Sequence, residues 1–346
     1  MRKRGSLLRS RPPMHNASID VLAIGNAIVD VIARTDEAFL ARENVHKGAM
    51  QLIDEARAEH LYAAMGPTTV ISGGSGANTA VGVASLGAKA AFIGKVRDDE
   101  LGRLYGHDLR SIGVRFDVPS ATAGPATARS FILVTPDGER TMNTYLGACQ
   151  NLTPEDVDPH TVRAARYVYL EGYLWDPPEA KRAFRKAVTI AHEAGNAVAL
   201  TLSDPFCVDR YRDEFLGLMR DGSLDILFAN IHELRSLYQT GDDATALAAL
   251  RQEGVVAVVT RSAEGALVVT REETRAVPAF PVERLVDTTG ASDLFAAGFL
   301  AGLSRDLDHI GCARLGALAA AEVIQHIGAR PQRSLAELAR QEGLWP

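Results

Sequence analysis

One carboxylate, Asp293, directly follows a run of small residues, TTGAS, and precedes an apolar segment rich in Ala and Gly. The apolar segment predicts a helix over 291–303, so the N–H groups of Gly290, Ala291 and Ser292 lie at its unpaired, dipole-positive start. A phosphate can approach these N–H groups because no bulky side chain covers them. A carboxylate there would repel the phosphate, so we expect Asp293 to be a general base on a hydroxyl that attacks phosphorus. The structural alternative is a capping loop with an acid in the first turn.

Candidates for binding the acceptor of this transfer lie at a break in an apolar strand and around a glycine pair. They are Asn26, Asp30, Gly73, Gly74 and Asn78. The first two can bond sugar hydroxyls, with Asp30 as a bidentate acceptor, or can occupy a turn. The glycine pair allows close approach to a ligand, or forms a hinge. Asn78, a weak helix former in an Ala-rich helix, faces a ligand or bonds locally.

A second group of candidates follows two later strands and could hold a nucleotide. Its members are Asn230, Glu233, Thr260, Ser262 and Gly265. Glu233 could hold Mg²⁺ through water, and its alternative is a capping pair with Asn230 three residues earlier. The other three would contact phosphate or ribose of ATP, and their alternative is an ordinary hairpin turn.

The elements that must position these residues form an alternating pattern. Continuous apolar strands alternate with helices from about residue 165 onward, which predicts a parallel sheet covered on both faces. Before that point we expect a broken strand, a helix of small residues, a short strand and a β-hairpin around the turn TPDG. The predicted strands are 19–33, 90–94, 129–145 (two, as the hairpin), 167–172, 197–202, 224–230, 255–260 and 265–270, and the helices are 76–86, 177–195, 210–222, 291–303 and 308–326.

Composition bounds the class of protein. The chain has 346 residues, of which 47% are apolar and 23% charged, with a net charge of −6, so it can bury a sizeable core and has no overall basic character to attract nucleic acid or anionic membrane. No apolar run approaches the length of a membrane span. Three cysteines without metal-ligand spacing indicate reduced thiols in a cytoplasmic protein. The basic residues 1–17 are expected to form a disordered tail.

The ordered motifs resemble one known family. DTTGASD is similar to the C-terminal signature of the ribokinase-like (PfkB-type) carbohydrate and nucleoside kinases, and further motifs of that family follow one another in the expected order. They are GNAIVD (25–30), GGSGAN (73–78), GKVRDDELG (94–102), TPDGERTM (135–142), NIHE (230–233) and VTRSAEGALV (259–268). The resemblance implies an α/β three-layer sandwich with a mostly parallel central sheet and a small β-sheet lid. It places the kinase domain at 18–335, lid segments near 31–52 and 118–148, and a C-terminal extension at 336–346.

The resemblance also implies cofactors and an acceptor. It implies ATP and Mg²⁺, and a potassium ion near Asp287 and Thr289, where Asp287 could instead cap the turn. Segments 171–179 and 200–233 are similar to adenosine kinases, so the expected reaction is ATP + adenosine → ADP + AMP in a monomer or homodimer. Aromatic or apolar contacts to the purine could come from three residues, Phe131, Phe39 or Met50. Tyr173 and Trp175 form an aromatic pair in the first of those segments.

Three alternatives stay open. They are a ribose or fructose kinase of the same family, a non-catalytic nucleoside-binding regulator, and a Rossmann dehydrogenase. The last lacks a spaced glycine fingerprint after a strand. The regulator gains support from two departures, since Ser292 and Ser262 stand where the family usually has Gly.

Overall fold

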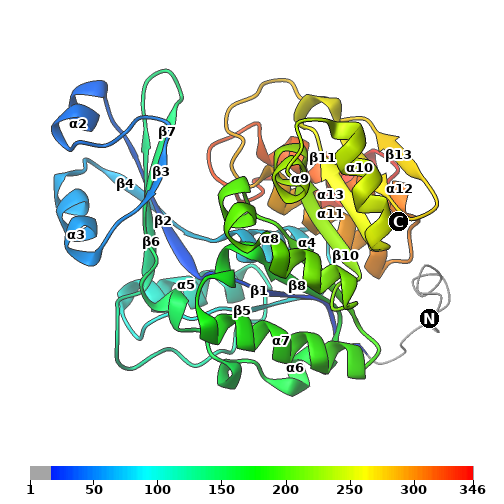
Figure 1. Ribbon diagram of the computed structural model, residues 1–346. Coiled ribbons are helices and arrows are strands. Elements are labelled where there is room, and N and C mark those ends of the chain that lie inside the picture. Colours follow the sequence, from blue (N-terminus) through cyan, green and yellow to red (C-terminus); the bar gives the residue numbers. More distant parts are fainter. Residues whose placement is uncertain (1–16, 346) are drawn as a thin grey trace.

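Two β-sheets organise the chain in the computed structural model, which describes residues 17–345 (Figure 1). The tail expected at residues 1–17 lies outside this range except for Ala17. The large sheet has the order β13-β12-β11-β10-β9-β8-β1-β5. Its strands are β1 (Ile19–Ile24), β5 (Ala90–Ile93), β8 (Ala165–Glu171), β9 (Ala197–Thr201), β10 (Ile226–Asn230), β11 (Val256–Thr260), β12 (Ala266–Val269) and β13 (Thr274–Val277).

The large sheet is mostly parallel, as the alternating pattern predicts. Strands β5, β1, β8, β9, β10 and β11 pair in parallel, whereas β12 and β13 are antiparallel. The predicted strand 265–270 is therefore present but runs against its neighbour, because only a tight turn separates it from β11 and a parallel partner needs a longer crossover. The carboxyl ends of the parallel strands meet at one edge, where ligands of such sheets bind.

Helices cover both faces of this sheet. Successive residues of β1 alternate between two apolar cores, so that Val21 and Ala23 face one and Leu22 and Ile24 the other. The first core is covered by α4, α11 and α12, and the second by α6 to α10. The helices are α2 (Glu37–Arg42), α3 (Glu55–Ala64), α4 (Ser75–Ser85), α5 (Glu100–Ser111), α6 (Pro159–Arg163), α7 (Pro178–Glu193), α8 (Pro205–Arg220), α9 (Ile231–Tyr238), α10 (Asp243–Glu253), α11 (Ala291–Ser304), α12 (His309–Val323) and α13 (Leu335–Gln341).

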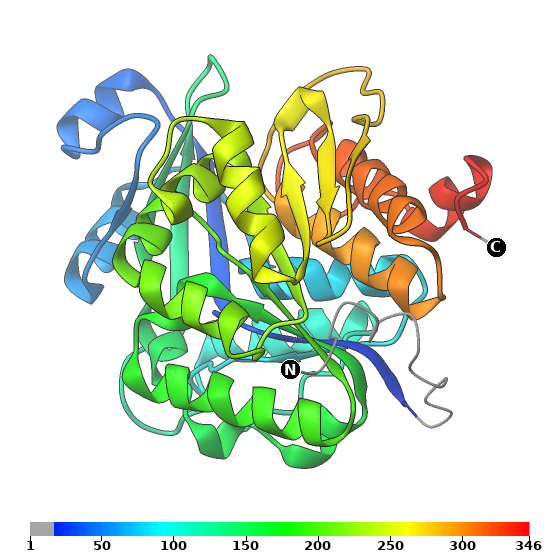
Figure 2. The ribbon, with the colours of Figure 1, turned by 45° about the vertical axis from the view of Figure 1, so that its right-hand side comes forward.

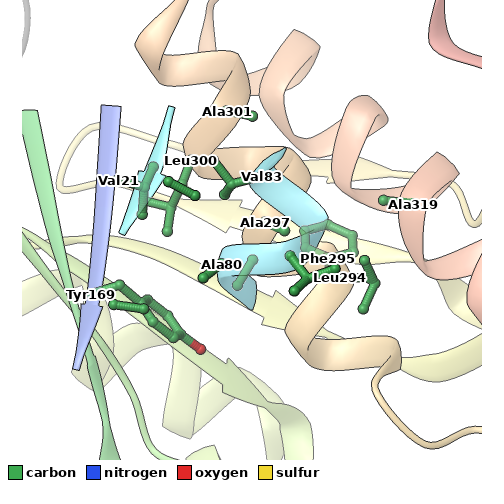
Figure 3. Packing of buried hydrophobic residues seen from close by; sticks show 14 of the residues in the cluster. Val21, Ala80, Val83, Tyr169, Leu294, Phe295, Ala297, Leu300, Ala301 and Ala319 are labelled. Carbon is green, nitrogen blue, oxygen red and sulfur yellow. The ribbon is translucent and has the colours of Figure 1, made fainter. Parts of the chain in front are cut away.

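The small residues of α11 allow it to lie between two other helices. Its apolar side chains pack beside those of α4 near Val21 and Tyr169 (Figure 3). A Cβ at Gly82 of α4 would lie 2.6 Å from the Cβ of Ala297, and one at Gly298 would lie 2.6 Å from Gly316 of α12. The Ala/Gly-rich sequence after Asp293 thus reflects close packing on both sides of the helix.

The small sheet stands beside the body as the predicted lid. Its order is β3-β7-β6-β2-β4, with β2 (Ile28–Arg34), β3 (Met50–Leu52), β4 (Thr68–Gly73), β6 (Ala128–Val134) and β7 (Arg140–Tyr145). Helices α2 and α3 lie on the side of this sheet away from the body (Figures 1 and 2). The expected lid segments omit β4, which joins the lid to α4. The expected boundary at residue 336 falls inside α13, which packs against α12 and α4. Within the described residues, every helix is too short or too polar to cross a bilayer.

Candidate active site

Asp293 lies buried in the first turn of α11 and is held from α4. Its Oδ1 accepts a hydrogen bond from Ser75 Oγ at 2.7 Å, and its Oδ2 accepts one from Asn78 Nδ2 at 2.9 Å. Burial raises the pKa of Asp293, while the hydrogen bonds from Ser75 and Asn78 oppose that rise. We predicted that Asn78 either binds the molecule that receives the phosphoryl group or forms a local hydrogen bond. In this structure its side chain donates to Asp293. Sequence reasoning missed Ser75, although its spacing of three residues from Asn78 places both on one helix face.

The loop before α11 presents backbone donors at the helix start. Gly290 is the N-cap with φ +79°, and a Cβ there would lie 2.6 Å from the Cβ of Ala329. The N–H of Ala291 donates to Thr288 O at 3.2 Å, so this donor is partly committed. In the described structure the N–H groups of Gly290 and Ser292 have no protein partner. Ser292 has no left-handed backbone angle, so it replaces the usual Gly without backbone strain.

Asp30 projects from β2 on the face of the lid sheet that is turned to the body. Register pairs it with Ser130 and Ile71, whereas its neighbours Val29 and Val31 are buried on the opposite face. A Cβ at Gly73 would lie 2.3 Å from Asp30 Oδ2, so this approach requires Gly. In the described part of the chain no group donates a hydrogen bond to the Asp30 carboxylate. Burial raises its pKa to about 6, against the attraction of Arg330 and Arg140.

Asn26 is buried and bonded to a carboxylate that sequence reasoning missed. Glu171, at the end of β8, accepts hydrogen bonds from Asn26 Nδ2 at 2.8 Å, Asn26 N at 3.2 Å and Gly76 N at 2.7 Å. Burial raises the pKa of Glu171 to about 7. Glu171 thus joins the end of β1 to the start of α4, and it takes one of the two side-chain N–H donors of Asn26. Gly74, with φ +92°, is the N-cap of that helix.

The predicted nucleotide residues share one edge of the large sheet. Asn230 and Thr260 are register partners at the ends of β10 and β11. Asn230 and Glu233 form the capping box that was the structural alternative, with Asn230 N donating to Glu233 Oε2 at 2.9 Å. Ser262, with φ +52°, and Gly265, with φ +81°, both adopt the left-handed region in the turn that follows. The missing glycine at 262 therefore falls at a position where Gly is favoured.

The side chains near the proposed nucleotide site can be compared with the ligands that Mg²⁺ takes in proteins. Among residues 17–345, no group of three or more His, Cys, Asp or Glu side chains could hold a metal ion by itself. Mg²⁺ in kinases is bound mainly by phosphate oxygens and water, so one carboxylate near the phosphates fits it. Burial raises the pKa of Glu233 to about 7, which a nearby cation would counter.

The side chains expected at a potassium site are paired with an arginine of the lid. Arg140, in β7, donates to Asp287 Oδ2 and to Thr289 Oγ1. Burial would raise the pKa of Asp287, but hydrogen bonds from Gly328 N and Thr289 N, together with Arg140, lower it. The guanidinium thus already supplies the positive charge, and these two side chains do not fit a further cation. Within the described residues, Nε and Nη2 of Arg140 are buried without a partner, and sequence reasoning missed this residue.

The aromatic residues predicted near a purine lie mostly elsewhere. Phe131 follows Ser130 in β6, so its side chain lies on the face opposite Asp30 and contacts Tyr62 of α3. Phe39 belongs to α2 and is buried beneath that helix, so neither residue lies where a purine was predicted. Trp175 is buried in the second core. Met50 is 46% exposed on the same lid face as Asp30. Tyr173, 39% exposed, lies just after β8 at the ligand edge.

The chain is similar in sequence and in structure to known kinases. A family model described as pfkB family carbohydrate kinase matches residues 18–335. A crystal structure of adenosine kinase from Sinorhizobium meliloti is 55% identical, covers 94% of this chain and 100% of its own, and has a TM-score of 0.89. A probable sugar kinase from Rhizobium etli is 52% identical, covers 95% of this chain and 99% of its own, and has a TM-score of 0.90. The ATP-dependent ribose-1-phosphate kinase of Halopiger xanaduensis is 33% identical over 238 residues, which are 68% of this chain and 74% of its own.

Proposed function

Because this chain belongs to the pfkB family of carbohydrate kinases, we propose that it transfers the γ-phosphoryl group of ATP to the 5′-hydroxyl of adenosine. The observation that carries the proposal is the buried Asp293, held by Ser75 and Asn78 at the tip of a helix with open N–H groups. The likeness to the S. meliloti adenosine kinase supports adenosine as the acceptor.

In this proposal Asp293 takes the proton of the attacking hydroxyl, and the free N–H groups of Gly290 and Ser292 stabilise charge on the migrating group. The two unpartnered nitrogens of Arg140 donate to phosphate oxygens when the lid is closed. Asp30 accepts hydrogen bonds from two ribose hydroxyls. Asn230 and Glu233 would hold Mg²⁺, Glu233 through water, and the ion would supply positive charge that neutralises the phosphates.

The surfaces on either side of the site favour a nucleoside over a free sugar. The lid face that carries Asp30 also exposes Met50 and Leu52, the latter by 58%. Tyr173 and Phe206, 39% and 65% exposed, lie after β8 and β9 at the ligand edge. Exposed apolar side chains around a polar pocket suit a purine ring, whereas a sugar needs hydrogen-bonding groups in that volume.

Three finer points complete the proposal. The buried free thiols of Cys149, Cys207 and Cys312 support a reducing, cytoplasmic setting. A potassium ion would have to displace Arg140 from Asp287 and Thr289, so the proposed reaction requires none. We propose that one chain is sufficient for catalysis, whether it exists as a monomer or in a homodimer.

The second candidate is a sugar kinase, favoured by the R. etli and H. xanaduensis relatives. A panel of ADP-release assays separates the two, with adenosine, guanosine, inosine, cytidine, ribose, ribose 1-phosphate and fructose as acceptors. We expect turnover with adenosine, and its loss in Asp293→Asn while adenosine still binds by calorimetry. Turnover with a sugar alone would contradict the nucleoside assignment. Binding without ADP release by the wild type would instead indicate a non-catalytic regulator.

A further inference from the structure

Arg330 lies beyond α12 and bonds backbone carbonyls of a segment more than 250 residues earlier in the chain. Its Nε and Nη2 both donate to Ser72 O, at 2.8 and 2.6 Å, and its Nη1 donates to Ala77 O at 3.0 Å. Ser72 is the last but one residue of the lid strand β4, and Ala77 lies in the first turn of α4. A planar guanidinium with three fixed donors holds these two carbonyls at a set spacing.

The residues just before Arg330 support the phosphate end of the site. Gly328 N donates to Asp287 Oδ2 at 2.8 Å, and Ala329 packs so closely on Gly290 that a side chain there would clash. A three-residue segment therefore contacts the loop before α11 at one end and the glycine-pair segment at the other. Gly73 of the glycine pair lies directly against the Asp30 side chain. The helix that follows the pair contains Ser75 and Asn78, which donate hydrogen bonds to Asp293.

The same guanidinium is the cation that acts on both functional carboxylates. Asp30 is faced by Arg330 and Arg140 and by the carboxylates of Asp293 and Asp287. Asp293 accepts hydrogen bonds from Ser75 and Asn78 of α4, and the positive charge of Arg330 also lowers its pKa. Arg330 interacts electrostatically with Tyr105 and Asp108 as well as with Asp30 and Asp293. Three titratable groups near β8, Glu171, Tyr169 and Tyr173, also face Asp293. Arg330 thus acts on a cluster in which the other charged neighbours of Asp293 are acidic.

We infer that Arg330 is a positioning residue, which clamps Ser72 and Ala77 and so holds Asp293 and Asp30 in fixed relation to each other. This inference rests on the proposed function, since it assigns a role within that site. Arg330 lies outside all the sequence motifs by which the chain resembles the family. Arg330 donates to backbone and contacts no reacting atom, so it acts only through Ser72, Ala77 and the field at the two carboxylates.

The experiment compares Arg330→Gln and Arg330→Lys with Arg333→Gln, an exposed arginine of the same loop. The pH dependence of kcat/KM for adenosine is measured for each. We expect the acid limb of the Gln variant to move up by about one pH unit, because a nearby opposite charge lowers a carboxyl pKa by about 1–3. The Lys variant should regain the wild-type limb but not its kcat, since it restores charge without the planar three-donor clamp. Arg333→Gln should match the wild type.

A Gln variant whose profile superposes on that of the wild type after scaling would overturn the inference, as would the same shift in Arg333→Gln. Urea unfolding of wild type and Arg330→Gln at pH 4.5 and pH 8 gives a readout that needs no turnover. The loss of stability should be greater at pH 8, where the carboxylates that Arg330 balances are ionised. An equal loss at both pH values would also overturn it. Absence of turnover in the wild type with every acceptor would refute the proposed function, while the unfolding data would still test Arg330.

Discussion

Replacing Asp30 by Asn should stabilise the free protein at neutral pH while weakening acceptor binding. The wild-type carboxylate is half-buried, and in the described structure it has no hydrogen-bond donor. Its pKa is raised from 3.8 to about 6, chiefly by burial. A rise of this size corresponds to about 3 kcal/mol of disfavoured ionisation. We therefore expect Asp30→Asn to raise the free energy of unfolding at pH 8 by up to about 3 kcal/mol.

The sign of the pH dependence follows from the direction of the pKa shift. Because the pKa of Asp30 is higher in the folded than in the unfolded chain, its favourable contribution is present in full below pH 3.8 and is lost as the pH rises through about 6. The Asn variant does not ionise. The difference in stability between variant and wild type should therefore grow between pH 4 and pH 6 and stay constant above that range.

Urea unfolding followed by circular dichroism at pH 4, 5, 6, 7 and 8 measures this difference. Asp213→Asn, at an exposed position of α8, is the matched control and should show no such dependence. A difference that is constant across the pH range would refute the reasoning, because it would reflect the amide group and not the lost charge. In the same variant KM for adenosine should rise at least about 100-fold, since two hydrogen bonds to a charged group are lost at about 1.5–3 kcal/mol each.

Three further predictions concern other parts of the site. Gly73→Ala should raise KM for adenosine at least about tenfold with little loss of stability, because the new Cβ would lie 2.3 Å from Asp30 Oδ2. Gly66→Ala is the control and should leave KM unchanged, because no atom lies within 4 Å of its Cβ position. Equal KM values for the two variants would contradict the assignment of Asp30. Ser262→Gly should raise the free energy of unfolding by about 0.5–1 kcal/mol, because it relieves a φ of +52°, and calorimetry showing a lower melting temperature would exclude that strain. Replacing potassium by sodium or tetramethylammonium in the assay should leave turnover unchanged, since Arg140 occupies Asp287 and Thr289, and a strong dependence on potassium would show that these side chains do bind the ion.

The sequence supports predictions best where chemistry and local structure coincide. The helix start at Ala291, the strand break at Gly25-Asn26 and the hairpin around TPDG all lie where their local patterns indicate. The hydrophobic periodicity could not predict the structural consequence of this strand break. It separates β1 and β2 into different sheets, because three residues between them carry the chain from the body to the lid.

The partners of the site residues could not be predicted because they are distant in the chain. Glu171 meets Asn26 across 145 residues, and Arg140 meets Asp287 across 147. Neither residue is conspicuous in its own segment, and only the packing of sheet against lid brings the pairs together. Phe131 was misplaced for a related reason, since an apolar strand does not reveal which of its faces is turned to a ligand.

The small sheet is joined to the body at one end of its strands only, so Asp30 and Arg140 lie at different distances from the attachment. The chain crosses between body and lid near Gly25, Gly74, Ala128 and Gly147, all at one end of the strands. Ser130, the register partner of Asp30, is two residues from Ala128, and Val134, the partner of Arg140, is six residues from it. At about 3.3 Å per residue these lie about 7 and 20 Å from the pivot. A tilt of the small sheet about this end would move the backbone at Arg140 about three times as far as that at Asp30. In the reaction proposed above, we therefore expect Arg140 to leave Asp287, and the polyphosphate to be released, before the acceptor's hydroxyls are freed.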